Sequence, residues 1–168
     1  MLHEFTKKLT NPTHTSCPAA WNHRARRNLP FLLSSFAIGL LGIALLYKGW
    51  LLPGILIMMQ TVASFMADVW NCGLPSVWHG IDKQLAVVSA LSVLYFLVVS
   101  TTDCASHSSV APLLRFLLTA LAPLAIAAGC YRKSVVAQKS SDMEGFFFHH
   151  ACWHYAVSSG CVAVLMEC

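Results

Sequence analysis

The chain has 168 residues, of which 57% are hydrophobic and only 11% are charged, and its mean hydropathy is +0.62. Soluble globular domains carry about 25% charged residues, so this composition excludes an ordinary soluble domain and indicates an integral membrane protein. The formal net charge is +4, but no basic patch is interleaved with exposed aromatic residues. We therefore expect membrane lipids as partners and no nucleic acid, while protein partners are not predicted.

The chain divides into a polar, basic N-terminal arm, residues 1–29, and a transmembrane helical domain, residues 30–168. The arm does not have the early apolar core of a secretory signal. The domain contains five apolar stretches, each about long enough to cross a hydrocarbon core of roughly 30 Å. These stretches are residues 30–47, 51–68, 80–100, 110–131 and 145–167. The sequence predicts an all-α, polytopic transmembrane helix bundle of about five spans.

Lysine and arginine fall mainly on one side of this predicted bundle. The arm holds five of them, whereas the opposite side has only Lys48. The connections that return to the side of the arm hold four more, Lys83, Arg132, Lys133 and Lys139, and Arg115 falls within the fourth predicted span. By the positive-inside rule, we expect a cytosolic N-terminus and a C-terminus on the far side of the membrane.

Seven cysteines are scattered along the chain without a Cys-x-x-Cys pair, which is typical of small apolar residues inside helices. Cys104 and Cys168 both fall on the predicted far side. They can pair there if that compartment is oxidising.

Polar residues gather where the second span ends and the third begins. Ser64 and Asp68 are four residues apart and share one helix face. His79 and Asp82 are three residues apart and share a face of the next helix. An acidic residue in a first helical turn also suits the helix dipole, so Asp82 has a purely structural interpretation as well.

The last span carries His150 and His154, again four residues apart on one face. Ionisable side chains inside a membrane usually face the bundle interior and mark a functional site. The topology brings this end of the last span to the same leaflet as Asp68 and His79. Three imidazoles, from His79, His150 and His154, with an open fourth position are typical of a catalytic Zn²⁺ site.

Three further residues on this side are candidate catalytic groups. We expect Asp68 to accept a proton and Ser64 to stabilise charge on a substrate oxygen. Asp82 is the second acid/base candidate, or a partner for an imidazole N–H.

Two blocks of the chain resemble the CREST superfamily of membrane hydrolases, which includes the alkaline ceramidases and adiponectin-type receptors. The resemblance is carried by Ser64-x3-Asp68-x10-His79 and by His150-x2-Trp153-His154. It implies a zinc-dependent hydrolase of a lipid amide or ester, with Ser64, His150 and His154 at the family's positions.

The chain departs from that pattern in two ways. Asp68 stands where the superfamily has a histidine, and His79 stands about where it has an aspartate. The superfamily also has seven spans, whereas five are predicted here. The exchange leaves the same residue types available but puts hydrolytic activity in question.

Two other functions fit the same residues. In a non-catalytic membrane subunit or receptor, the polar cluster would only tie helices together, and no metal would bind. In a haem-binding protein, histidines would approach a porphyrin from opposite sides. His150 and His154 share a face and cannot both ligate one haem, although one of them paired with His79 can.

Overall fold

The computed structural model describes residues 17–107 and 110–167, and every regular element in these residues is a helix. Two short elements, η1 (Ala19–Trp21) and α2 (Asn22–Ala25), precede the long helices. These are α3 (Leu29–Tyr47), α4 (Leu51–Ser64) with its π-helical continuation η2 (Phe65–Trp70), α5 (Trp78–His107), α6 (Val110–Lys139) and α7 (Met143–Glu167). Each long helix covers one of the predicted apolar stretches, so the all-α prediction is confirmed.

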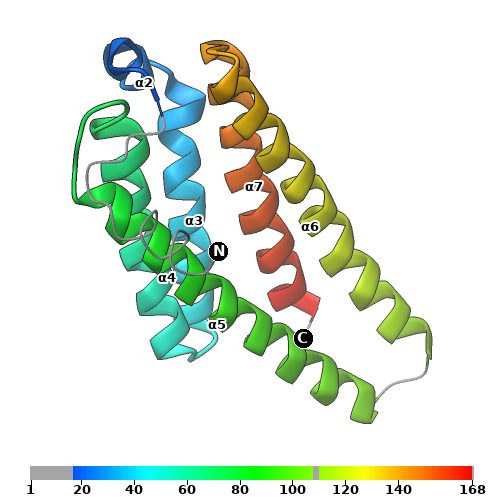
Figure 1. Ribbon diagram of the computed structural model, residues 1–168. Helices are drawn as coiled ribbons and strands as arrows, with labels where there is room; N and C mark the ends of the chain where they lie inside the picture. The colour runs from blue at the N-terminus through cyan, green and yellow to red at the C-terminus, as the bar shows by residue number, and fades with distance from the viewer. Residues whose placement is uncertain (1–16, 108–109, 168) are drawn as a thin grey trace, which may run out of the picture.

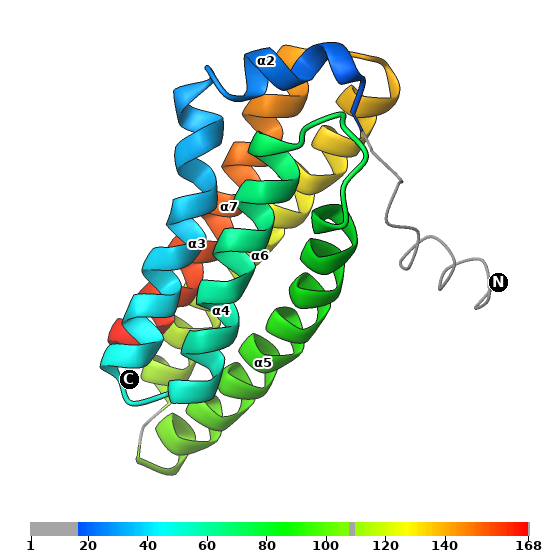
Figure 2. The ribbon, with the colours of Figure 1, turned by 90° about the vertical axis from the view of Figure 1, so that its left-hand side faces the viewer.

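The long helices run up and down and pack in the order α6, α7, α3, α4, α5 (Figure 1). The outermost two, α5 and α6, are consecutive in the chain but contact each other only weakly. One end of the bundle carries α2, the loop after η2 and the α6–α7 connection (Figure 2). These segments therefore meet at one end, as the predicted topology requires.

Two apolar clusters hold the bundle together. Near the α2 end, Trp21, Phe31 and Phe147 are buried with residues from η2. Near the opposite end, Leu41 and Leu45 of α3 pack against α4 and α7. The central helix pair, α3 and α7, contributes to both clusters, so it forms the framework on which the polar groups of the interior are placed.

Close helix contacts depend on a few small residues. A side chain at Gly54 of α4 would meet Leu46 of α3 at 2.6 Å, which brings these two helices together. The α3–α4 turn contains Gly49 at φ 81°, a left-handed conformation that glycine adopts without strain. A side chain at Gly160 of α7 would collide with Pro123 of α6.

Within the described residues, two helices are long and apolar enough to cross a membrane, Leu29–Tyr47 and Leu51–Trp70. The prediction of five spans is therefore not confirmed. Polar residues lower the mean hydropathy of the later helices, as His149, His150 and His154 do in α7. The predicted pairing of Cys104 with Cys168 involves Cys168, which lies outside the described residues.

Candidate metal centre

The two histidines predicted to share a face of α7 do so, and that face is turned into the bundle. His154 is only 2% exposed, and His150 is half-buried one turn earlier. Their rings are 4.6 Å apart between centroids. A helix places residues i and i+4 one above the other, so both imidazoles approach whatever lies opposite this face.

Asp68 of η2 lies opposite this pair. Its Oδ2 accepts a hydrogen bond from His150 Nε2 at 3.1 Å and another from Ser64 Oγ at 3.1 Å. One ligand atom from each of Asp68, His150 and His154 lies within 4.8 Å of the other two. The structure thus places a carboxylate and two imidazoles around one point between η2 and α7.

Asp68 lies in the π-helical segment η2. From Phe65 to Trp70 the backbone widens, and Asn71 N donates to Met66 O at 3.0 Å, five residues back. The Asn71 side chain donates to the same carbonyl at 2.7 Å. Single π-helical turns are rare and often occur at functional sites, because they change where a side chain points relative to the preceding helix.

Ser34 of α3 fixes the hydrogen position on His154. The Ser34 hydroxyl donates to Phe31 O at 2.7 Å, and Ser34 Oγ also lies 3.1 Å from His154 Nδ1. A hydroxyl has one proton, so at the second contact Ser34 accepts and His154 Nδ1 donates. The lone pair of His154 is then on Nε2. This is how an outer partner orients a metal-binding imidazole.

His79 and Asp82 lie elsewhere. His79 Nε2 donates to Leu74 O at 3.0 Å, within the loop that leads into α5. Asp82 Oδ1 accepts from Gln60 Nε2 of α4 at 2.6 Å. The structure therefore puts Asp68, rather than His79, beside the histidine pair, because a short hydrogen bond inside the loop already uses the His79 ring.

Two residues of this polar network were not singled out from the sequence. Gln60 is four residues before Ser64, which is four before Asp68, so a polar residue at every fourth position of one helix was the available signal. Ser34 gave no such signal, since a small polar residue in an apolar span is commonly a packing residue.

Aromatic side chains enclose the cluster. Phe31, Phe146 and Trp153 each place a ring 5.1–5.7 Å from the His150 ring. Trp21 of η1 packs on Phe146 with 5.6 Å between ring centroids. These apolar walls limit access of water and so strengthen the electrostatic interaction between Asp68 and His150.

Segment α2 covers the same end of the site. Arg26 donates to Trp70 O through Nε at 3.2 Å and Nη2 at 2.6 Å, and its guanidinium lies 4.3 Å from the centre of the Trp70 ring. Asn22 Nδ2 donates to Trp70 O and to Cys72 O. A hydrogen bond with Cys17 and burial both raise the pKa of the Cys72 thiol. The hydrogen bonds from Asn22 and Arg26 connect the end of η2 to the N-terminal segment.

No family model matches the chain, and neither a curated protein nor a solved structure matches it. The resemblance to CREST hydrolases therefore rests on the residue spacings alone. The geometry adds an independent observation, the convergence of Asp68, His150 and His154.

Proposed function

We propose that the protein is an integral membrane, metal-dependent hydrolase of a lipid amide or ester. The observation that carries the proposal is the convergence of Asp68, His150 and His154 in the interior of a bundle with apolar outer faces. Two imidazoles and one carboxylate form a donor set typical of catalytic zinc, which uses three protein ligands and keeps a fourth position open. The residues present thus fit Zn²⁺, with Asp68 in place of the predicted His79.

The bound ion would polarise a substrate carbonyl and lower the pKa of a water molecule. In the hydrolysis, the oxygen of a water molecule would add to the carbonyl carbon as Asp68 takes a proton from that water, and the C–N or C–O bond would break as this proton passes to the leaving amine or alcohol. Asp68 has two carboxylate oxygens, so one can serve as ligand while the other accepts the proton of the attacking water.

Ser64 and Ser34 have supporting roles in this proposal. The Ser64 hydroxyl donates its one proton to Asp68 Oδ2 at 3.1 Å, so in this proposal it holds the carboxylate in position and stabilises its negative charge. Ser34 keeps the His154 Nε2 lone pair available by accepting from Nδ1. Asp82 is bound to Gln60 and acts at most as a more distant acid.

The outer faces of the helices support a position in the membrane. Large apolar side chains are exposed on all five long helices, among them Leu40, Leu52, Leu91, Leu121 and Phe148, each more than half exposed. Apolar surface of this extent marks contact with lipid or with a partner. We infer a multi-pass bundle with the α2 end on the cytosolic side, as the distribution of Lys and Arg indicates.

The orientation has its own test, which uses single cysteines in a cysteine-free background of the protein. Arg24→Cys and Lys48→Cys are at opposite ends of the bundle, and both parent side chains are exposed. In sealed vesicles of known sidedness, an impermeant maleimide should label them from opposite sides, with Arg24→Cys on the cytosolic side. Labelling of both from one side would contradict the inference.

The function is tested by metal analysis and hydrolysis on the detergent-purified protein. We expect about one zinc per chain, loss of that zinc in His150→Ala, and loss of hydrolysis of a fluorescent lipid amide or ester in the same variant. His149→Ala is the matched control, because its side chain is on a different face of α7. It should keep both zinc and activity.

The outcomes separate the three functions. Zinc in both the wild-type protein and His149→Ala but not in His150→Ala supports the hydrolase. A protein without metal, with an intact fold, would favour the non-catalytic subunit or receptor. A Soret band in the purified protein would favour haem.

A further inference from the structure

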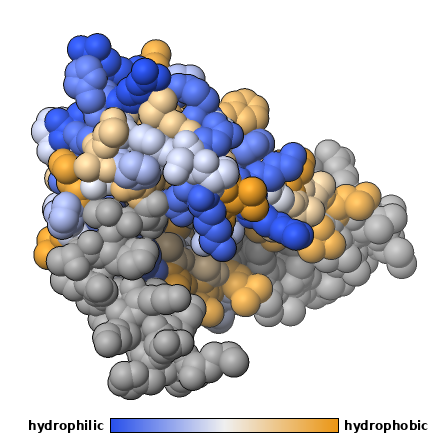
Figure 3. All heavy atoms as spheres, turned by 45° about the horizontal axis from the view of Figure 1, so that its top comes forward, coloured by the Kyte–Doolittle hydropathy of each residue, from blue (hydrophilic) through white to orange (hydrophobic). Residues whose placement is uncertain are grey.

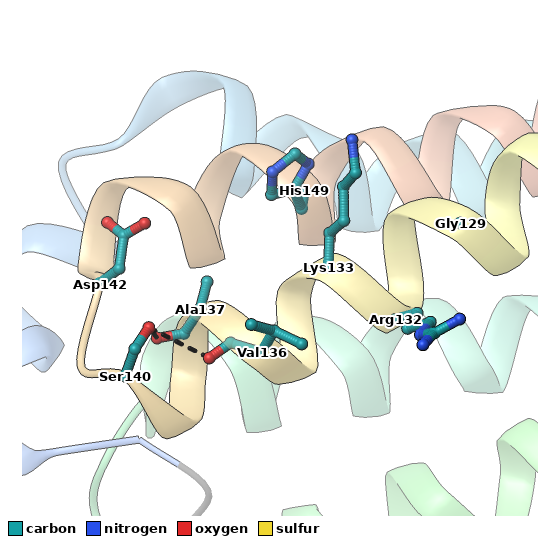
Figure 4. A pocket seen from close by; sticks show the side chains of 8 residues that line it. All are labelled: Gly129, Arg132, Lys133, Val136, Ala137, Ser140, Asp142 and His149. Atoms are coloured by element: carbon teal, nitrogen blue, oxygen red, sulfur yellow. Dashed lines mark hydrogen bonds between the residues drawn. The ribbon is translucent and has the colours of Figure 1, made fainter.

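A groove between α6 and α7 lies on a different face of α7 from the metal centre. It has two adjoining parts of about 520 Å³ each, and both parts are lined by Gly129, Lys133 and His149. Figure 4 shows Lys133 and His149 projecting side by side from the two helices. The shared lining residues make this one continuous feature.

The part of the groove near the α6–α7 connection is basic. It is lined by Arg132 and Lys133, both exposed, and neither is in an ion pair with any residue that the structure describes. The nearby carboxylate of Asp142 accepts from Gly145 N at 3.0 Å and so caps the start of α7. Asp142 also lines this part of the groove, so two cationic side chains and one carboxylate leave it with a net positive charge, and neither cation is paired with a carboxylate in the described part of the chain.

The other part of the groove is apolar. Its lining includes Ile126 of α6 and Phe148 and Tyr155 of α7. Ile126 is seven residues before Lys133, or about 10 Å further along the helix from the basic part. Hydrophilic residues gather at the end of the bundle where α2 and the α6–α7 connection lie (Figure 3). The basic part is thus at the polar end and the apolar part reaches toward the middle of the bundle.

We propose that this groove binds one anionic phospholipid. Arg132 and Lys133 would hold the phosphate, with His149 beside it, and an acyl chain would lie along Ile126, Phe148 and Tyr155. A basic pocket between helices on the cytosolic side, continued by an apolar channel, is complementary to a negatively charged head group with a hydrocarbon tail. The site is separate from the metal centre and does not depend on hydrolysis.

Gly129 gives the proposal a sharp test. It lines both parts of the groove, and a Cβ atom at this position would meet nothing within 4 Å. A leucine at Gly129 would therefore begin in open space and extend into the groove that this residue lines. It would also improve the helix propensity of α6, so loss of binding in such a variant would not come from unfolding.

The experiment uses the full chain in phosphatidylcholine vesicles that contain a trace of spin-labelled phosphatidic acid or of spin-labelled phosphatidylcholine. The fraction of motionally restricted label gives the relative association constant of each lipid. We expect the wild-type protein to select phosphatidic acid. Each of Arg132→Gln and Lys133→Gln should lower that selectivity about fivefold, the value of one basic side chain near a membrane surface. Gly129→Leu should abolish it.

Two matched controls make the outcome decisive. Lys139→Gln removes a basic residue from the same end of α6 that does not line the groove. Ala128→Leu adds the same bulk at a neighbouring exposed position outside it. Both should keep the selectivity for phosphatidic acid. Equal losses in Lys139→Gln and Lys133→Gln, or in Ala128→Leu and Gly129→Leu, would overturn the proposal in favour of diffuse surface charge or general lipid contact.

Discussion

The two faces of α7 hold chemically identical side chains in opposite environments. His150 faces η2 and α3 and donates to Asp68, whereas its neighbour His149 faces the groove with α6. Consecutive helical residues differ by about 100° around the axis, so adjacency in the sequence says little about a shared role. On the inner face the polar groups bind one another. On the outer face the basic groups have no partner in the described part of the chain, which leaves them for a ligand from outside.

The interface between α6 and α7 is closely packed at one place and open at another. Near Pro123 and Gly160 the helices touch so closely that no side chain fits, whereas at Gly129 the space is open. The lack of a side chain therefore has a different effect at each of the two glycines. One allows close packing, and the other keeps a groove free.

Removing the carboxylate of the inner face should have the largest effect. In Asp68→Asn the shape of the side chain is kept, but the proposed anionic ligand and the charged acceptor for His150 and Ser64 are lost. We expect the zinc affinity to fall more than about 100-fold, beyond the 10–100-fold cost of losing an outer partner of a ligand. Competition with a chromophoric chelator measures it.

Asp82→Asn is the control for this variant, because Asp82 is bound to Gln60 and lies outside the cluster. It should bind zinc as the wild-type protein does. If Asp82→Asn lost zinc while Asp68→Asn kept it, the proposed ligand set would be wrong.

The second-largest effect should be a difference in the free energy of unfolding between leucine variants at Gly160 and at Gly129. Gly160→Leu forces α6 away from α7 at Pro123, and overpacking of this kind costs about 1–3 kcal/mol or somewhat more. Gly129→Leu should be neutral or stabilising by up to about 1 kcal/mol. Thermal unfolding in one detergent gives both values. A similar loss in the two variants would show that α6 and α7 are packed equally closely at both places.

The sequence predicted the helices well because a long apolar run has few other structures open to it. It predicted less of the candidate site, because the site depends on loop geometry and helix phase. Nothing in the spacing of His79 indicated that Leu74 O would take its ring N–H. Nothing indicated that a π-helix would carry Asp68. Ser34 touches His154 from 120 residues away in the chain, a contact that no local pattern encodes.

Two neighbouring serines of α3 allow a test of whether the Ser34 hydroxyl orients the His154 ring on the inner face of α7. Ser34 and Ser35 are both fully buried, but only Ser34 contacts His154, whereas Ser35 Oγ has no hydrogen-bond partner in the described structure. Ser34→Ala should lower zinc affinity about 10–100-fold, because His154 loses the group that fixes its tautomer. Ser35→Ala should leave the affinity unchanged. The same titration measures both, and equal values would remove Ser34 from the site.

The smallest effect is expected at the segment that covers the site. Arg26 holds the end of η2 through two hydrogen bonds to Trp70 O and stacks on the Trp70 ring, whereas Arg27 makes no side-chain hydrogen bond or cation–π contact with η2 in the described structure. Both side chains are exposed, so water replaces much of what a substitution removes. We expect Arg26→Gln to lower the free energy of unfolding by about 1 kcal/mol and Arg27→Gln to leave it unchanged. Because Asp68 is also held by Ser64 and His150, zinc affinity should change little in either variant. A fall in affinity in Arg26→Gln as large as that of Ser34→Ala would mean that α2, and not the inner face of α7, sets the position of the carboxylate.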